Sequence, residues 1–251
     1  MTAQGLGKAV LSAVFPDRCA YCGEVIPRGT ACCPACATSL MRIDPPVCPL
    51  CGCGRADCGC GKRHHPYDRC VAPFYYEGPA RSGILRMKER ERPYIIEELA
   101  CQMAAVWKRD YGDVKLDGVA FIPMIRQEER RRGFNQSRLL AGRVADIFAL
   151  PLWAALSKIQ ETRPQKSLTA YERSGNVLGA FDADPAYPVK GKRLLLVDDL
   201  VSTGSTAGEC AKVLKLYGAA EVSLLTAAVN RLEGEETKKA SPAAAGTPLS
   251  E

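Results

Sequence analysis

The sequence predicts an α/β fold with a parallel sheet, preceded by a small cysteine-rich metal-binding module. Apolar runs typical of buried strands alternate with helical stretches in the second half of the chain. One of these runs ends in two adjacent carboxylates and a Ser/Thr/Gly string, as expected of a ligand site at the edge of a parallel sheet. Eleven of the 13 cysteines lie between Cys19 and Cys70, which marks that segment as a separate unit.

Length, charge and hydropathy are consistent with this division. The 251 residues, 47% of them hydrophobic, suffice for one ordinary domain and a smaller module. The formal net charge of +6 is compatible with phosphorylated or polyanionic ligands. The first apolar stretch contains Lys8 and lacks a cleavage site, and no apolar run approaches the roughly 18 residues that span a bilayer. We therefore expect a soluble, cytoplasmic protein without membrane insertion.

We expect four segments along the chain. Residues 1–18 form a short amphipathic helix that packs on the body of the protein, with binding to a membrane surface as the alternative. Residues 19–72 form the cysteine-rich module, and residues 73–231 form the larger domain. Residues 232–251 are small, polar and proline-bearing, which predicts a disordered tail.

The cysteine spacing predicts two structural Zn²⁺ sites. Each Cys-x2-Cys turn supplies two thiolates, and two such turns complete a tetrahedral site whose metal contributes the folding energy that a small core lacks. The first expected set is Cys19, Cys22, Cys33 and Cys36. The second, weaker set is Cys48, Cys51, Cys58 and Cys60.

Other interpretations of the cysteines remain open at this stage. Disulfides and an iron–sulfur cluster are the alternatives to zinc, although an odd cysteine count and a reducing compartment disfavour disulfides. Cys32, Cys53 and Cys70 are further candidate ligands, and His64 or His65 can replace a cysteine. Two adjacent histidines in a basic turn are more often simply solvated.

The larger domain begins with a basic run and a helix, followed by strands. The run from Arg81 to Arg92 precedes a helix from Tyr94 to about Lys108. Buried strands are expected at Gly118–Ile122, Arg193–Val197 and Glu221–Val229, with a helix from Asn135 to Phe148. Between the first strand and that helix, arginines including Arg130 and Arg132 can reach the sheet edge and contact an anionic ligand, or form a solvated basic loop.

The string after the second strand predicts a phosphate site. Backbone N–H groups from Thr203 to Thr206 can converge on a phosphate at a helix N-terminus, and Gly204 permits the close turn. Asp198 and Asp199 lie one short loop away, where they can accept hydrogen bonds from ribose hydroxyls and help to hold Mg²⁺. The alternative is an ordinary helix cap.

The stretch from Val197 to Thr206 resembles the phosphoribosyl-diphosphate (PRPP) signature of type I phosphoribosyltransferases. The resemblance implies that Asp198 and Asp199 engage the ribose hydroxyls in the catalytic site, with Mg²⁺ bridging ribose and pyrophosphate. It also implies that the 5′-phosphate is bound by the loop residues Ser202, Thr203, Gly204, Ser205 and Thr206.

Taken as a whole, the chain resembles the ComF family of competence-related phosphoribosyltransferase-like proteins. The resemblance rests on the cysteine module, the run from Ile84 to Lys88, the stretch from Arg132 to Gln136, the segment Gln165 to Phe181 and the PRPP loop. It implies pyrophosphate or loop contacts from Lys88, Arg130, Arg132, Gln165 and Arg173. It further implies a role in DNA uptake, with single-stranded DNA and a competence helicase-like protein as partners.

Three functions follow as expectations. The first is Mg²⁺-dependent transfer of a phosphoribosyl group from PRPP to an acceptor. The second is a non-catalytic adapter that binds single-stranded DNA through its basic runs and retains the fold for binding. The third is nucleotide-sensing regulation, with PRPP binding and DNA binding linked without turnover.

Overall fold

The computed structural model describes residues 16–60, 65–159 and 180–231. The expected N-terminal helix lies, apart from its last three residues, outside this part of the chain, as do the expected tail and His64, Gln165 and Arg173. Among the helices of the described residues, none is both long and apolar enough to cross a membrane.

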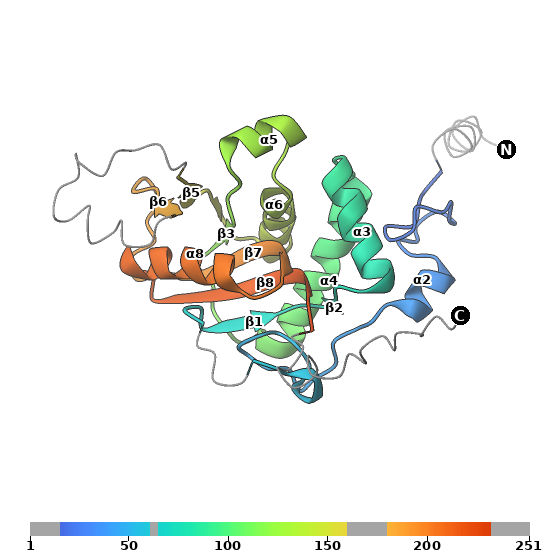
Figure 1. The fold of residues 1–251 in the computed structure, drawn as a ribbon, viewed down its shortest axis with the longest axis horizontal. Coiled ribbons are helices and arrows are strands. Elements are labelled where there is room, and N and C mark those ends of the chain that lie inside the picture. Colours follow the sequence, from blue (N-terminus) through green and yellow to red (C-terminus); the bar gives the residue numbers. More distant parts are fainter. Residues whose placement is uncertain (1–15, 61–64, 160–179, 232–251) are drawn as a thin grey trace, which may run out of the picture.

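A parallel sheet organises the larger domain (Figure 1). Its strands lie in the order β1-β8-β7-β3-β4, with β2 also paired to β8, and every one of these pairs is parallel. The strands are β1 Arg69–Val71, β2 Phe74–Tyr75, β3 Gly118–Phe121, β4 Leu152–Trp153, β7 Arg193–Val201 and β8 Glu221–Val229. A separate antiparallel pair joins β5 Leu156–Lys158 and β6 Phe181–Ala183. The predicted parallel α/β architecture is confirmed.

Helices cover both faces of the sheet. Because successive side chains of a strand point to opposite faces, alternate residues are buried in two different cores. On β7, Leu195 and Val197 pack with residues of three helices: α3 Gly78–Glu89, α4 Pro93–Tyr111 and α6 Gln136–Phe148. Leu194 and Leu196 pack with α8 Ser205–Leu216 on the other face.

The cysteine module lies against both of these cores. Its described helices are α2 Pro34–Ser39 and the 3₁₀ turn η1 Arg55–Asp57. Cys19, Cys33 and Cys36 pack in the core that contains α3 and α4. Cys48, Cys51 and Cys60 pack in the core that contains α8. The two halves of the module therefore contact opposite faces of the sheet.

Two elements differ in extent from the expectation. The strand expected to end at Val197 continues to Val201, because β8 runs to Val229 and supplies backbone partners, with Asp198 opposite Thr226. The arginine-rich stretch after β3 forms a helix, α5 Arg126–Arg132, which ends at Gly133 with a φ of 89°. Acidic residues in its first turn and arginines in its last turn complement the helix dipole.

Candidate functional site

The loop between β7 and α8 has the geometry of an anion site. Gly204 caps α8 with a φ of 76° and a ψ of 2°, a left-handed conformation that glycine adopts without steric cost. The hydroxyl-bearing residues Ser202, Thr203, Ser205 and Thr206 are exposed around it. The Oγ atoms of Thr203 and Ser205 lie 2.9 Å apart. The N–H of Ser205 donates to Thr203 Oγ1 at 3.4 Å, and the N–H groups of this helix start together with the hydroxyls suit a bound phosphate.

Two carboxylates precede the loop in β7. Asp198 Oδ1 accepts a hydrogen bond from Ser137 Oγ at 2.8 Å and from the backbone N–H of Asp199 at 2.9 Å. Burial, reinforced by the negative charge of Asp199, raises the pKa of Asp198 to about 7. A carboxyl with this pKa gains or loses its charge near neutral pH, which is typical of functional sites.

A cation from α3 balances the second carboxylate. Lys88 Nζ lies 2.8 Å from Asp199 Oδ2, and the Asp199 side chain is only 12% exposed. Lys88 comes at the end of α3, Asp199 from β7 and Ser137 from the start of α6, so three elements meet at the carboxylate pair. Lys88 is thus paired directly with the second carboxylate of β7.

The remaining predicted cations lie on α5 or outside the described residues. Arg130 is exposed and Arg132 is half-buried. Arg126 and Arg130 line an open hollow with Glu129 and Gly133. Figure 1 shows α5 and α3 projecting on the same side of the sheet. Gln165 and Arg173 fall in the segment that the structure does not describe.

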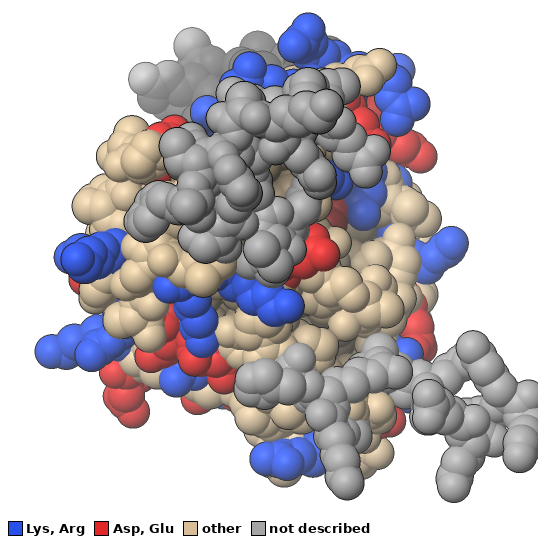
Figure 2. All heavy atoms as spheres, turned by 60° about the vertical axis from the view of Figure 1, so that its left-hand side comes forward, with Lys and Arg blue, Asp and Glu red and all other residues tan. Residues whose placement is uncertain are grey.

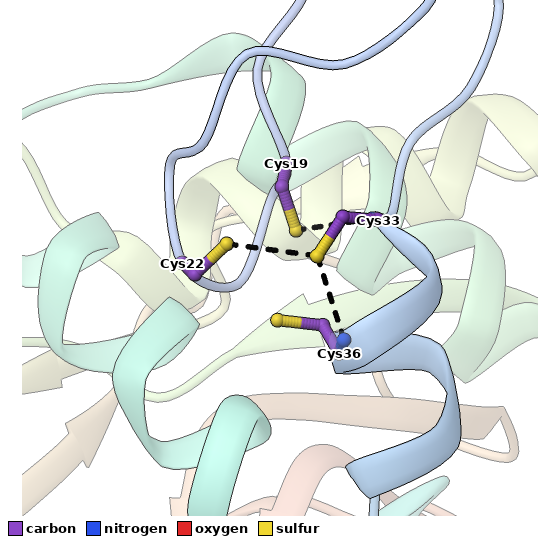
Figure 3. A group of neighbouring side chains, drawn as sticks. All are labelled: Cys19, Cys22, Cys33 and Cys36. Carbon is purple, nitrogen blue, oxygen red and sulfur yellow. Dashed lines mark hydrogen bonds between the residues drawn. The ribbon is translucent and has the colours of Figure 1, made fainter.

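The first predicted cysteine set forms a compact cluster (Figure 3). The sulfurs of Cys19, Cys22, Cys33 and Cys36 all lie within 4.8 Å of one another. Burial opposes ionisation of Cys19, but backbone N–H groups of Cys22, Cys33 and Tyr21 outweigh it and lower its pKa to about 6. A thiolate stabilised in this way is the form that binds Zn²⁺.

The second set is as compact as the first. The sulfurs of Cys48, Cys51, Cys58 and Cys60 also lie within 4.8 Å of one another, and Cys48 and Cys60 Sγ are 3.7 Å apart. The one-residue gap between Cys58 and Cys60 therefore does not prevent a four-sulfur site. The donor set, four thiols in mutual reach, fits a structural Zn²⁺ ion.

The extra candidate ligands have other contacts. Cys32 donates to the carbonyl of Cys33, and Cys53 to the carbonyl of Asn230. Cys70 lies within β1, and its N–H donates to the carbonyl of Pro49 at 2.7 Å. Each of these three cysteines is a free thiol outside the two clusters.

Sequence reasoning missed Ser137 and the segment His65–Tyr67. Ser137 carries no signal of its own beyond its place directly after the stretch Arg132 to Gln136. His65, for which the sequence predicts a solvated side chain or a zinc ligand, lies against Gly204 in the loop between β7 and α8. His65 follows Cys60 by five residues, and this spacing does not predict in which direction its side chain points.

Fold and site together define a parallel α/β domain, with a carboxylate pair and a glycine-capped helix start at one sheet edge, joined to a pair of four-cysteine clusters. Residues 10–71 match the model of a family described as a double zinc ribbon domain. The chain is 30% identical over 211 residues to "DNA utilization protein YhgH" of Salmonella typhimurium, covering 82% of this chain and 87% of that protein. It is 27% identical over 223 residues to "Competence protein F" of Haemophilus influenzae, covering 84% and 96%. The chain belongs to the ComF family.

Solved structures with similarity to the chain include phosphoribosyltransferases. Adenine phosphoribosyltransferase from Thermoanaerobacter pseudethanolicus aligns with a TM-score of 0.40 and 18% identity, covering 63% of this chain and 80% of that one. The "allosteric regulatory enzyme of purine biosynthesis" aligns with a TM-score of 0.37 and 20% identity over 52% of this chain. The chain spans only 25% of the length of that enzyme.

Proposed function

We propose that this chain binds PRPP with Mg²⁺ at the loop from Val197 to Thr206 and transfers its phosphoribosyl group to an acceptor. The observation that carries the proposal is the Gly204-capped loop at the N-terminus of α8, directly after the carboxylate pair of β7. A phosphate bound at the loop would leave a ribose within reach of those carboxylates. The proposal includes a cytoplasmic location, where PRPP is made.

The roles follow residue by residue from the family resemblance and the local chemistry. Asp198 and Asp199 accept hydrogen bonds from the ribose hydroxyls, and the loop from Ser202 to Thr206 donates to the 5′-phosphate. The cations assigned to pyrophosphate or loop contacts are Lys88, Arg130, Arg132 and Arg173, with Gln165 as a polar contact. Mg²⁺, held with PRPP at the carboxylates, would neutralise the charge of the pyrophosphate.

The proposed transfer requires the protein to position the ribose and the acceptor and to stabilise charge, more than it requires covalent catalysis. The acceptor lone pair forms a bond to C1 of the ribose, the bond from C1 to pyrophosphate breaks, and pyrophosphate leaves with the electron pair. The acceptor then loses its proton. Cations around the leaving group and an ordered ribose lower the barrier of such a step.

In this proposal the two zinc ribbons are structural. We place the zinc module at residues 19–72, the last of which form β1 Arg69–Val71 and pair with β8, and the phosphoribosyltransferase domain at residues 73–231. Each cluster has four cysteine sulfurs in mutual reach and therefore no open coordination position for a substrate.

The relatives named for competence and DNA utilization favour a second candidate function. A non-catalytic adapter in DNA uptake would bind single-stranded DNA, with a helicase-like partner, and would use the fold for binding alone. The basic surface of α5, which carries four arginines against two glutamates, is the observation on this chain that supports it.

Calorimetry with PRPP and Mg²⁺ tests the first proposal. We expect saturable binding by the zinc-loaded protein, lost when Asp198→Ala and Asp199→Ala are combined. Asp113→Asn, which changes an exposed carboxylate elsewhere, is the control. Absence of binding by the wild type, or unchanged binding by the double variant, would refute the PRPP site. Release of pyrophosphate with a panel of nucleobases and amines would then separate a transferase from an adapter.

A further inference from the structure

The short segment from His65 to Tyr67 packs between the second cysteine cluster and the loop from Ser202 to Thr206, here called the phosphate loop. A Cβ atom added to Gly204 would lie 2.8 Å from Tyr67 Oη and 3.1 Å from His65 Cε1. One turn further along α8, a Cβ atom added to Gly208 would lie 3.1 Å from Pro66 Cδ. Two glycines on α8 thus leave the room that this segment occupies. The packing is close enough to fix the position of the helix start.

Tyr67 is held on its other side by the zinc ribbon. Its hydroxyl donates to the carbonyl of Leu50 at 2.9 Å, and Leu50 lies between the cluster cysteines Cys48 and Cys51. The Tyr67 side chain is 2% exposed, and its ring stacks on that of His65 with centroids 4.9 Å apart. A single buried hydroxyl therefore bonds the metal-binding turn and occupies the space in which a Cβ atom of residue 204 would lie.

We propose that Tyr67 is a positioning residue, through which the second zinc ribbon holds the phosphate loop in its binding conformation. The inference rests on the proposed function of that loop. Zinc folds the turn that contains Leu50, Leu50 fixes Tyr67, and Tyr67 with His65 packs on Gly204. A loop that is already ordered loses less entropy when phosphate binds, so its affinity is higher.

Coupling of this kind is reciprocal. If the zinc-loaded ribbon tightens PRPP binding, bound PRPP must stabilise the zinc-loaded ribbon by the same factor. Simple loss of packing at Tyr67 would lower the stability of the fold without linking the two ligands. Zinc release in the presence and absence of PRPP therefore distinguishes a positioning role from a structural one.

The test uses Tyr67→Phe in the full-length, zinc-loaded protein, with Tyr75→Phe as the matched control. Tyr75 is 3% exposed, and its hydroxyl bonds Gly54 and Asp57 of the same ribbon. Each variant loses one buried hydroxyl that bonds residues of the second ribbon. We expect Tyr67→Phe to weaken PRPP·Mg²⁺ binding by roughly fivefold, the loss of about one hydrogen bond. Tyr75→Phe should leave the affinity within about twofold of the wild type.

Release of zinc to a chromogenic chelator provides the second measurement. PRPP should slow one phase of zinc release in the wild type and in Tyr75→Phe, and should not slow that phase in Tyr67→Phe. Equal PRPP affinities for the two variants, or the same protection of zinc by PRPP in both, would overturn the inference. A wild type that binds no PRPP would instead refute the proposed function itself.

Discussion

At the scale of single residues, Asp198 combines a proposed ligand role with a cost to stability. Its carboxyl lies among buried groups beside Asp199, and its pKa is about 7 instead of 3.8. Between these two pH values the folded state holds a proton that the unfolded chain has released. The free energy of unfolding therefore falls as the pH rises through this window and is lowest, with respect to this group, above about pH 7.

Replacement by asparagine removes that buried charge. We expect Asp198→Asn to exceed the wild type in free energy of unfolding by on the order of 2 kcal/mol at about pH 8, with a smaller difference at about pH 5.5. Urea unfolding of the zinc-loaded proteins at the two pH values measures this. The same variant should bind PRPP less well, because a neutral amide cannot accept hydrogen bonds from ribose as a carboxylate does.

The exposed Asp113 supplies the control for this prediction. Asp113→Asn also removes one negative charge but should show no pH-dependent difference from the wild type. If Asp198→Asn is destabilising at both pH values, the hydrogen bonds from Ser137 and Asp199 outweigh the cost of burying the carboxylate, and burial does not limit stability at this position.

Gly204 is a second residue at which geometry dictates the amino acid. Alanine there would suffer from the positive φ and from contact with Tyr67 Oη at 2.8 Å. Gly191 has a similar φ of 72°, but a Cβ atom added to it meets nothing within 4 Å. We expect Gly191→Ala to cost about 1 kcal/mol, and Gly204→Ala to cost a further 1–3 kcal/mol or so from overpacking.

Chemical denaturation of the two glycine variants measures this difference directly. Gly204→Ala should also weaken binding of PRPP, whereas Gly191→Ala should not. Equal losses of stability would mean that the segment from His65 to Tyr67 moves aside easily, and that backbone conformation alone requires glycine.

At the scale of elements, pattern and spacing predicted most of what positions the site. The long strands at 193 and 221 follow from apolar runs, and the helix from Gln136 begins one residue after the predicted start because the Asn135 side chain accepts from Arg138 N–H as its cap. Strands β1, β2 and β4, of two or three residues each, are too short for a periodic pattern. They exist because β8 and β3 offer parallel backbone edges.

Contacts between residues that lie far apart in the sequence could not be predicted in the same way. Cysteine spacing gave both four-sulfur sets, because ligands of one metal occur in local pairs. The hydrogen bond from Ser137 to Asp198 joins residues 61 positions apart, and the packing of His65 on Gly204 joins the zinc module to α8. Such contacts depend on how the layers dock, which no local pattern encodes.

The zinc ribbons allow a prediction at this scale. We expect elemental analysis to find two Zn²⁺ ions per chain in the wild type and one in Cys58→Ser, since three sulfurs bind a structural zinc far more weakly than four. Cys101, an exposed cysteine outside both clusters, provides the control, and Cys101→Ser should retain two. Iron in place of zinc, or paired cysteines without metal, would contradict the assignment.

Thermal unfolding complements the metal analysis. Because metal binding contributes to folding, removal of zinc by a strong chelator should lower the melting temperature of the wild type and leave a smaller further effect in Cys58→Ser. The two clusters pack in different cores, so each ion stabilises a different face of the sheet. Unchanged melting after complete removal of both ions would show that the module folds without them.

At the scale of the whole molecule, the charge distribution limits where the proposed adapter function could bind DNA. A net charge of +6 is modest for a nucleic-acid-binding protein of this length. In Figure 2, lysine and arginine side chains on the visible face are interspersed with aspartate and glutamate and do not form one continuous basic field. Arginines are concentrated instead on α5. We therefore expect DNA binding to be local to this helix and moderate in strength.

The salt dependence of binding tests this expectation. Each neutralised phosphate of a single strand contributes about −0.7 to the slope of log affinity against log salt, so contacts from three or so arginines of α5 predict a slope near −2. Arg130→Ala combined with Arg131→Ala should halve that slope or more. Arg28→Ala combined with Lys115→Ala also removes two positive charges, but from exposed positions elsewhere, and should change the slope little. Fluorescence anisotropy with a labelled single strand, repeated from low to high salt, gives both slopes. Equal slopes for the two double variants would place DNA binding away from α5, and a salt-insensitive signal would remove the support for the adapter function.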